Sequence, residues 1–186
     1  MSKLLYSATM SLDGFIAGAD GDMSWLTEYL GPNPVAEDLV ARIGSLLIGR
    51  RTFGGDDPNA GTEKEGAFGG AWSGPQIVLT HDPPARSVPD VAFHTDLDTA
   101  VAAAKTAAGG RYVNVLGADV ARQCVAAGVL DEVLVFVAPV LLGDGVRLFE
   151  HPGGTNVALE RLSSGEAPQA THLWFRVLFP AGQGRP

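Results

Sequence analysis

Residues 112–138 read YVNVLGADVARQCVAAGVLDEVLVFVA and contain a complete strand–helix–strand unit. The runs Tyr112–Leu116 and Glu132–Ala138 are short, apolar and bounded by turn residues, which is typical of strands buried on both faces. Between them, Asp119–Ala127 is expected to be helical, with Asp119 as its N-cap and Gly128 just past its end. Two buried strands joined by a helix predict a parallel pair with a right-handed crossover.

The same alternation extends through the rest of the chain. Further buried strands are expected at residues 4–10, 45–48 and 76–80. A helix is expected around Val35, Leu39 and Ile43, which recur every four residues. A second helix is expected over Asp98–Ala108, because the Gly109-Gly110 pair is a strong stop signal.

The last part of the chain departs from this pattern. Val157–Leu162 and Thr171–Phe179 flank the polar segment Ser163–Pro168, which predicts an antiparallel hairpin at one edge of the sheet. The chain is therefore expected to be an α/β protein with a mostly parallel central sheet, helices on both faces and a C-terminal antiparallel hairpin. The Gly-rich segment 54–75 has no periodicity and is expected to be a lid or a disordered loop.

Length, charge and cysteine content exclude several classes of protein. With 186 residues, we expect a single domain over residues 1–180 and a frayed tail at 181–186. A net charge of −8 argues against nucleic acid as a partner. The one cysteine, Cys124, excludes a disulfide framework, and the four scattered histidines give no metal-ligand spacing. The sequence shows neither a signal peptide nor a membrane span, so we expect a cytoplasmic protein that does not bind membranes.

Three segments follow predicted strands and are candidates for ligand binding. Gly49-Arg50-Arg51-Thr52 has the groups of a phosphate clamp, although two surface arginines would look the same. Gly117 lies at a strand–helix junction, where a small residue suits either a phosphate or a tight turn. The third segment, Thr80-His81, ends another strand. In a parallel sheet all these strand ends lie at one edge, where ligands bind, so together they favour a nucleotide site.

The ordered motifs of the chain resemble the dihydrofolate reductase-like superfamily, and among its branches the RibD C-terminal domain type. The segments that carry the resemblance are SLDGFIA at 11–17, LIGRRTF at 47–53, VLGA at 115–118, VLDEVL at 129–134, APVLLGDG at 138–145 and Leu148-Phe149. They occur in the family's order and cover most of the chain.

The resemblance implies an NADPH site. The positions that match cofactor-binding residues are Ala8, Thr9, Ile16, Gly49, Arg50, Arg51, Thr52, Thr80, His81, Gly117 and Ala118. In the family, the first three hold the nicotinamide carboxamide, residues 49–52 hold the pyrophosphate and 2′-phosphate, and Thr80 and His81 match the adenosine 2′-phosphate side. Gly117 and Ala118 match a Gly-Gly pair against which the cofactor packs.

On the substrate side, the resemblance implies contacts from Asp13 and Trp25. We expect the proton to come through Asp13, Glu28 or a water molecule. Asp13 also suits an Asx turn, and Glu28 also suits an exposed surface position. The acidic residue of true dihydrofolate reductases falls on Leu30, so an authentic dihydrofolate reductase is not expected.

The leading hypothesis is an NADPH-dependent oxidoreductase that reduces a small heterocyclic (pterin- or pyrimidine-like) or sugar-linked substrate. An alternative is a catalytically silent nucleotide-binding or interaction domain, and a third is a flavin binder. The resemblance also implies a homodimer, for which the strand 132–138 or the hairpin edge would supply the pairing edge.

Overall fold

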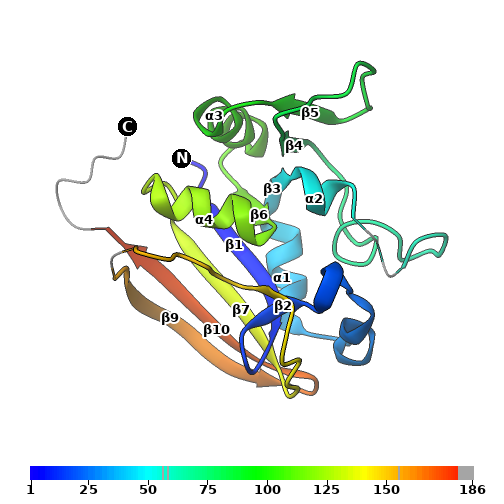
Figure 1. Ribbon diagram of the computed structural model, residues 1–186, viewed down its shortest axis with the longest axis vertical. Helices are drawn as coiled ribbons and strands as arrows, with labels where there is room; N and C mark the ends of the chain where they lie inside the picture. Colours follow the sequence, from blue (N-terminus) through cyan, green and yellow to red (C-terminus); the bar gives the residue numbers. More distant parts are fainter. Residues whose placement is uncertain (56, 58, 155, 180–186) are drawn as a thin grey trace.

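An eight-stranded sheet forms the centre of the protein (Figure 1). The computed structural model describes residues 1–55, 57, 59–154 and 156–179. The strand order is β5-β4-β3-β6-β1-β7-β10-β9. The bounds are β1 Leu4–Ser11, β3 Ile43–Gly49, β4 Gln76–Leu79, β5 Val91–His94, β6 Tyr112–Leu116, β7 Glu132–Ala138, β9 Ala158–Ala167 and β10 Ala170–Leu178. The strands from β5 to β7 are parallel, and β10 is antiparallel to both β7 and β9.

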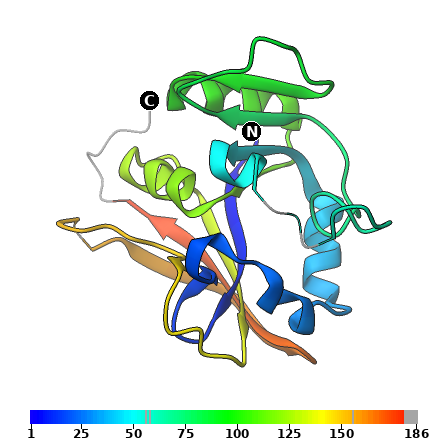
Figure 2. The same cartoon turned by 45° about the vertical axis from the view of Figure 1, so that its right-hand side comes forward.

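Helices cover both faces of this sheet, as Figures 1 and 2 show. On one face, α3 (Leu97–Ala108) and α4 (Ala118–Ala126) pack against Leu4 and Tyr6 of β1. On the other face, α1 (Pro34–Arg42) packs through Leu39 against Leu5. The expected architecture of a mostly parallel sheet with helices on both faces and a C-terminal antiparallel hairpin is confirmed. The remaining elements are β2 Phe15–Ala17, η1 Ala19–Gly21, η2 Ser24–Tyr29, α2 Arg50–Phe53 and β8 Val146–Arg147.

Helix ends follow capping chemistry that is visible in the sequence. The Asn33 side chain accepts hydrogen bonds from two first-turn amides of α1, and Pro34 occupies the first helical position. Asp96 caps α3 in the same way, and Gly109 ends it with a φ of +58°. The expectation that Ile43 belongs to the first helix is wrong. This residue starts β3, where it is fully buried, so its apolar side chain serves the sheet.

Two other local predictions are corrected by the structure. The N-cap of α4 is Gly117, two residues before the expected Asp119. The hairpin turn is also displaced, because β9 continues to Ala167 and only Pro168 and Gln169 separate it from β10. Since β9 is the edge strand and most of its residues are exposed, the polar residues 163–166 fit within it.

The segment 54–75 forms turns without helix or strand in its described residues. Its apolar side chains Ala67, Phe68 and Trp72 pack against the core on the α1 face. Trp72 Nε1 also donates a hydrogen bond to the Ile43 carbonyl, with an N···O distance of 3.3 Å. The described part is therefore a packed covering of that face. The predicted frayed tail, residues 181–186, lies outside the described residues.

A buried carboxylate joins the amino-terminal ends of the central strands. Glu132 is 2% exposed and accepts hydrogen bonds from Lys3 Nζ at 2.7 Å, Tyr112 Oη at 2.9 Å and Trp174 Nε1 at 2.9 Å. Burial, followed by the bond to Glu132, raises the pKa of Tyr112 to about 12. This satisfied network stabilises the edge of the sheet opposite to the carboxyl ends of the strands.

None of the helices in the described part of the chain is long and apolar enough to cross a lipid bilayer.

Candidate functional site

The chain reverses its direction of winding between β1 and β6. These strands are parallel neighbours, yet β1 leads to α1 on one face and β6 leads to α4 on the other. Parallel sheets bind ligands at the carboxyl ends of strands that diverge in this way. The β1–β6 pairing ends at Tyr6 and Val115, while β1 continues to Ser11 paired with β7. Beyond the paired region Ser7 is buried, while Ala8 and Thr9 are half-buried, and β6 pairs with none of these residues, so one backbone edge of β1 faces the crevice.

Two glycines next to the crevice allow α2 and α4 to approach each other. An added Cβ at Gly117 would lie 2.5 Å from Thr52 Oγ1, and one at Gly49 would lie 3.1 Å from Val120 Cγ2. Gly117 also has a φ of +101°, a conformation that side chains disfavour. No side chain caps the amino end of α4, which leaves the amides of its first turn available to an anion. The structure thus brings Gly49, Thr52 and Gly117 together, as the strand-end argument predicted.

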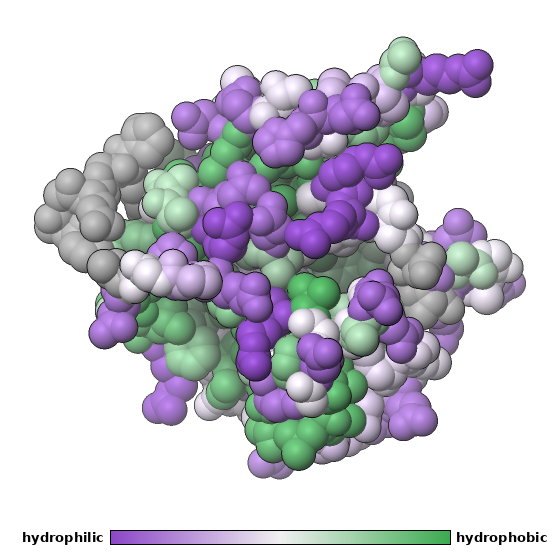
Figure 3. Space-filling model, in the orientation of Figure 1, coloured by the Kyte–Doolittle hydropathy of each residue, from purple (hydrophilic) through white to green (hydrophobic). Residues whose placement is uncertain are grey.

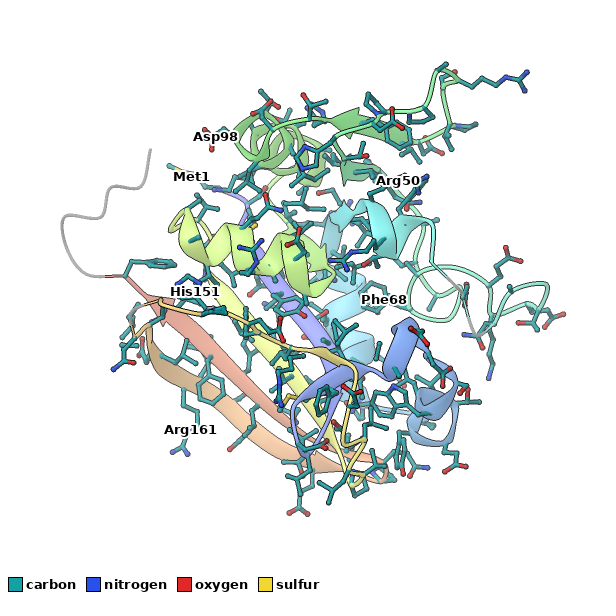
Figure 4. The ribbon with its side chains drawn as sticks, in the orientation of Figure 1. Met1, Arg50, Phe68, Asp98, His151 and Arg161 are labelled. Carbon is teal, nitrogen blue, oxygen red and sulfur yellow. The ribbon has the colours of Figure 1, made fainter. Side chains whose placement is uncertain are left out.

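Charges around this junction favour an anion despite the nearby acid Asp119. The Asp119 carboxylate accepts hydrogen bonds from Arg122 at 2.7 Å and Gln123 at 2.9 Å. The bond from Arg122 is the main cause that lowers the pKa of Asp119, and Arg51 lies close enough to contribute. Arg50 and Arg51 are exposed on α2, the helix beside the Arg50 label in Figure 4. The surface is hollowed just below α2 in the space-filling view (Figure 3).

The remaining predicted cofactor positions lie after β4, in β2 and at the start of α4. Thr80 follows β4, the neighbour of β3, but its buried Oγ1 accepts from the Asp82 amide at 3.2 Å and serves the local turn. His81 is exposed beside it. Ile16 belongs to β2, which pairs with β8, and Ala118 is the first residue of α4. Of the two residues predicted to lie beside the 2′-phosphate, Thr80 therefore has a buried hydroxyl that is already hydrogen-bonded, and His81 has an exposed imidazole.

Asp13 connects two loops at the far end of β1. Its carboxylate accepts hydrogen bonds from the amides of Leu142 at 3.1 Å and Gly143 at 2.7 Å. Hydrogen bonding by the Ser11 hydroxyl, and then by these amides, lowers the pKa of Asp13 to about 2. A carboxylate that is ionised and engaged in this way at neutral pH is suited to holding the loop that follows β7, and unsuited to donating a proton.

Trp25 and Glu28 both lie in η2, in different surroundings. Glu28 is exposed, as its surface interpretation predicted, and Leu30 lies just after the element. Trp25 is half-buried, and its ring contacts that of Tyr29 with a centroid distance of 6.0 Å. Its indole Nε1 is buried and has no hydrogen-bond partner among the described residues.

The sequence reasoning missed Asn114, a fully buried amide in the middle of β6. Its Oδ1 accepts a hydrogen bond from the Ser7 hydroxyl at 2.8 Å, while its Nδ2 is buried without a partner in the described part of the chain. The available signal was a single amide between valines in an otherwise apolar strand.

Two other features of the molecule bear on where a ligand could bind. The described residues contain no group of three metal-ligating side chains. A cavity of about 410 Å³ lies at the opposite edge of the sheet and is lined by Met1, Lys3, Ala41, Arg42, Gly110, Arg111 and Tyr112. Lys3 is paired with Glu132 and Arg42 with Asp38 at 3.0 Å, so two of the positive groups there are already balanced.

Comparison with known proteins is consistent with this geometry. The model of the RibD C-terminal domain family matches residues 2–173. The riboflavin biosynthesis protein RibD of Corynebacterium ammoniagenes is 29% identical over 169 residues, which cover 83% of this chain and 50% of that protein. The chain therefore spans about half the length of that curated relative.

Solved structures show the same fold. RibD of Acinetobacter baumannii superposes with a TM-score of 0.72 at 18% identity, over 96% of this chain and 59% of that one. A dihydrofolate reductase of Enterococcus faecalis, solved with NADP(H), superposes with a TM-score of 0.63 at 16% identity, over 94% of this chain and 96% of that one.

Proposed function

Because this chain belongs to the RibD C-terminal domain family, we propose that it is a reductase that uses NADPH to reduce a small heterocyclic or sugar-linked substrate. The observation that carries the proposal is the close approach of α2 and α4 beside the β1–β6 crevice. Gly49 and Gly117 leave room there that a Cβ would fill. The amides of the first turn of α4 suit a phosphate group.

The residues at this junction fit the parts of NADPH. The first turn of α4 and Thr52 would hold the pyrophosphate, while Arg50 and Arg51 would contact the 2′-phosphate through charge-assisted hydrogen bonds. The open backbone edge at Ala8 and Thr9 would orient the nicotinamide carboxamide. When bound, NADPH supplies a hydride to the substrate.

The protein's own contribution is to position the reactants and to exclude water. The described part of segment 54–75 packs over the α1 face, which suits a covering for the substrate. For the proton, we favour a water molecule. Asp13 is held ionised by its hydrogen bonds, and Glu28 is exposed on η2.

A fluorescence titration with NADPH and with NADH tests this proposal. Replacing Arg50 and Arg51 with alanine removes two charged contacts to the 2′-phosphate, each worth about 1.5–3 kcal/mol. NADPH binding should weaken by roughly 100-fold or more, and NADH binding should change little. Arg111→Ala, an exposed arginine at the opposite edge of the sheet, is the matched control and should leave both affinities unchanged.

Three outcomes would contradict parts of the proposal. If the Arg50→Ala/Arg51→Ala variant binds NADPH and NADH more weakly by the same factor, the two arginines do not contact the 2′-phosphate. If the wild type binds neither cofactor, the proposal of an NADPH-dependent reductase is wrong. Tight NADPH binding without oxidation across a panel of pterins, pyrimidines and quinones would favour the silent nucleotide-binding domain.

We also propose that the protein is a homodimer that pairs through β9. The alternative edge, β7, is occupied on both sides by β1 and β10. In contrast, β9 ends the sheet and exposes Leu159 by 48% and Leu162 by 38%. Light scattering should give a dimer for the wild type and a monomer for Leu159→Lys/Leu162→Lys. A monomeric wild type would contradict the proposal.

A further inference from the structure

The cavity of about 410 Å³ at the amino-terminal edge of the sheet has a basic lining. Its cationic residues each precede one of three neighbouring strands: Lys3 precedes β1, Arg42 precedes β3 and Arg111 precedes β6. Met1, labelled in Figure 4, lies at the same edge. None of the lining residues is acidic, although the chain carries 21 acidic and 13 basic residues. The lining is therefore an exception to the acidic character of the protein.

Buried groups behind the lining hold two of the cationic side chains in place. Glu132 binds Lys3 Nζ at 2.7 Å and Tyr112 Oη at 2.9 Å. The Arg42 guanidinium stacks on the rings of Tyr112 and Trp174, with distances to the ring centroids of 5.0 Å and 5.5 Å. Since these side chains are already ordered, a ligand that binds them meets a smaller entropic cost.

The carboxylates near this edge lie outside the lining of the cavity. Glu132 is 2% exposed, and the Asp131 carboxylate accepts a hydrogen bond from the Leu4 amide at 2.9 Å. Asp38 pairs with Arg42, but the Asp38 side chain is 63% exposed. Ion pairs in water contribute little, so Arg42 can exchange this carboxylate for another anion.

Arg111 supplies a positive charge that is not balanced. It is exposed, follows the glycine turn that ends α3, and forms no ion pair with any residue that the structure describes. Together with Arg42 and Lys3, it lines the cavity with two guanidinium groups and one ammonium group. Guanidinium groups bind phosphate oxygens through paired, charge-assisted hydrogen bonds. The cavity volume is within the range of about 300–1,000 Å³ that is usual for small-molecule sites.

We propose that this cavity is a second binding site, which takes a small phosphorylated molecule through Lys3, Arg42 and Arg111. It is separate from the crevice proposed for NADPH. Lys3 and Thr9 are six residues apart along an extended chain, which is about 20 Å at roughly 3.3 Å per residue. Neither α2 nor α4 contributes to the lining, so the site does not depend on the proposed reductase function.

The test uses pyrophosphate as the probe, at constant ionic strength, and follows the backbone amides of the isotopically labelled chain by two-dimensional NMR. This measurement distinguishes the cavity from the crevice, since both suit phosphate. Pyrophosphate should shift the amides of Arg42, Gly110 and Arg111 in a saturable way, with a dissociation constant of about 1 mM or lower. The Arg50→Ala/Arg51→Ala variant should keep these shifts, because both arginines lie at the other edge of the sheet.

Arg111→Ala is the informative variant, because it removes a cation without breaking an ion pair of the described structure. Its affinity for pyrophosphate at this edge should fall about tenfold or more, the effect of one charge-assisted contact. Without pyrophosphate, its thermal midpoint should equal that of the wild type. Saturating pyrophosphate should raise the midpoint of the wild type more than that of the variant. Arg86→Ala is the matched control, since Arg86 is exposed in the loop before β5, and it should bind pyrophosphate like the wild type.

Four results would overturn the inference. The first is the absence of saturable shifts at Gly110 and Arg111, and the second is an Arg111→Ala variant that binds pyrophosphate normally. The third is a set of shifts confined to the first turn of α4, which would mean that phosphate binds only at the crevice. The fourth is tighter binding of citrate than of pyrophosphate at this edge, which would mean that the cavity selects carboxylates.

Discussion

Substitution of Gly117 by alanine should both destabilise the protein and damage the junction of α2 with α4. The residue has a φ of +101°, where a residue with a Cβ carries backbone strain of about 1–3 kcal/mol. The added Cβ would also lie 2.5 Å from Thr52 Oγ1, an overpacked contact that costs about 1–3 kcal/mol. The sum is about 2–6 kcal/mol, a large part of the usual stability of about 5–15 kcal/mol.

The two contributions can be separated with a second substitution. Thr52→Ala removes the hydroxyl that the new Cβ meets, so the double variant should retain the backbone strain and lose the steric one. Urea unfolding of the wild type, the two single variants and the double variant measures their coupling. We expect a coupling free energy of about 1–3 kcal/mol, in the direction that makes the double variant more stable than the sum of the single effects.

Additive effects would refute this reasoning. If the unfolding free energies of Gly117→Ala and Thr52→Ala add within about 0.5 kcal/mol, the two side chains are not in contact. The close approach of α2 and α4 would then be wrong, and so would the phosphate position built on it. Gly110→Ala is a matched control, because Gly110 also has a positive φ, +91°, but no atom lies within 4 Å of its added Cβ. It should show backbone strain alone, with no coupling to Thr52.

Three further results are expected. Asp13→Asn should reduce the loss of stability on acidification. The Asp13 carboxyl, with its pKa lowered to about 2, contributes stability above about pH 4 that disappears as the pH falls toward 2. If the variant and the wild type unfold at the same acidic pH, this expectation is wrong. Tyr112 has a pKa of about 12 in the folded protein, so it contributes stability below pH 10 that is lost between pH 10 and 12. In Tyr112→Phe the free energy of unfolding should therefore fall less steeply with pH in that window. Trp72→Phe removes the indole bond to the backbone and should speed proteolysis within segment 54–75, while unfolding of the sheet measured by circular dichroism should shift by only about 1 kcal/mol.

Buried strands and the strand-end glycines were predictable because they depend on local composition. Apolar runs such as Tyr112–Leu116 and Glu132–Ala138 have few alternatives to the interior of a sheet, and the structure has strands with these bounds. Gly49 and Gly117 could be placed at one edge because parallel strands bring their carboxyl ends together. Those inferences needed only alternation and topology.

Other features depend on contacts between distant segments, which a local pattern does not contain. Ile43 fits a helical repeat, and only the position of β3 next to β6 explains its assignment to the sheet. The extension of β9 to Ala167 depends on its place at the sheet edge. The unpaired amide of Asn114 is visible only when Ser7, 107 residues away, is placed beside it.

The position of β1 also has a consequence for the order of folding during synthesis. This strand lies between β6 and β7, and its partners Asn114 and Asp131 follow 107 and 127 residues later in the chain. At about 5–20 residues per second, the strand waits roughly 6–25 s for them. Throughout that time Leu4, Leu5 and Tyr6 are exposed as an unpaired apolar strand. The nascent chain should therefore depend on a chaperone until β7 emerges, although the finished protein buries these residues completely.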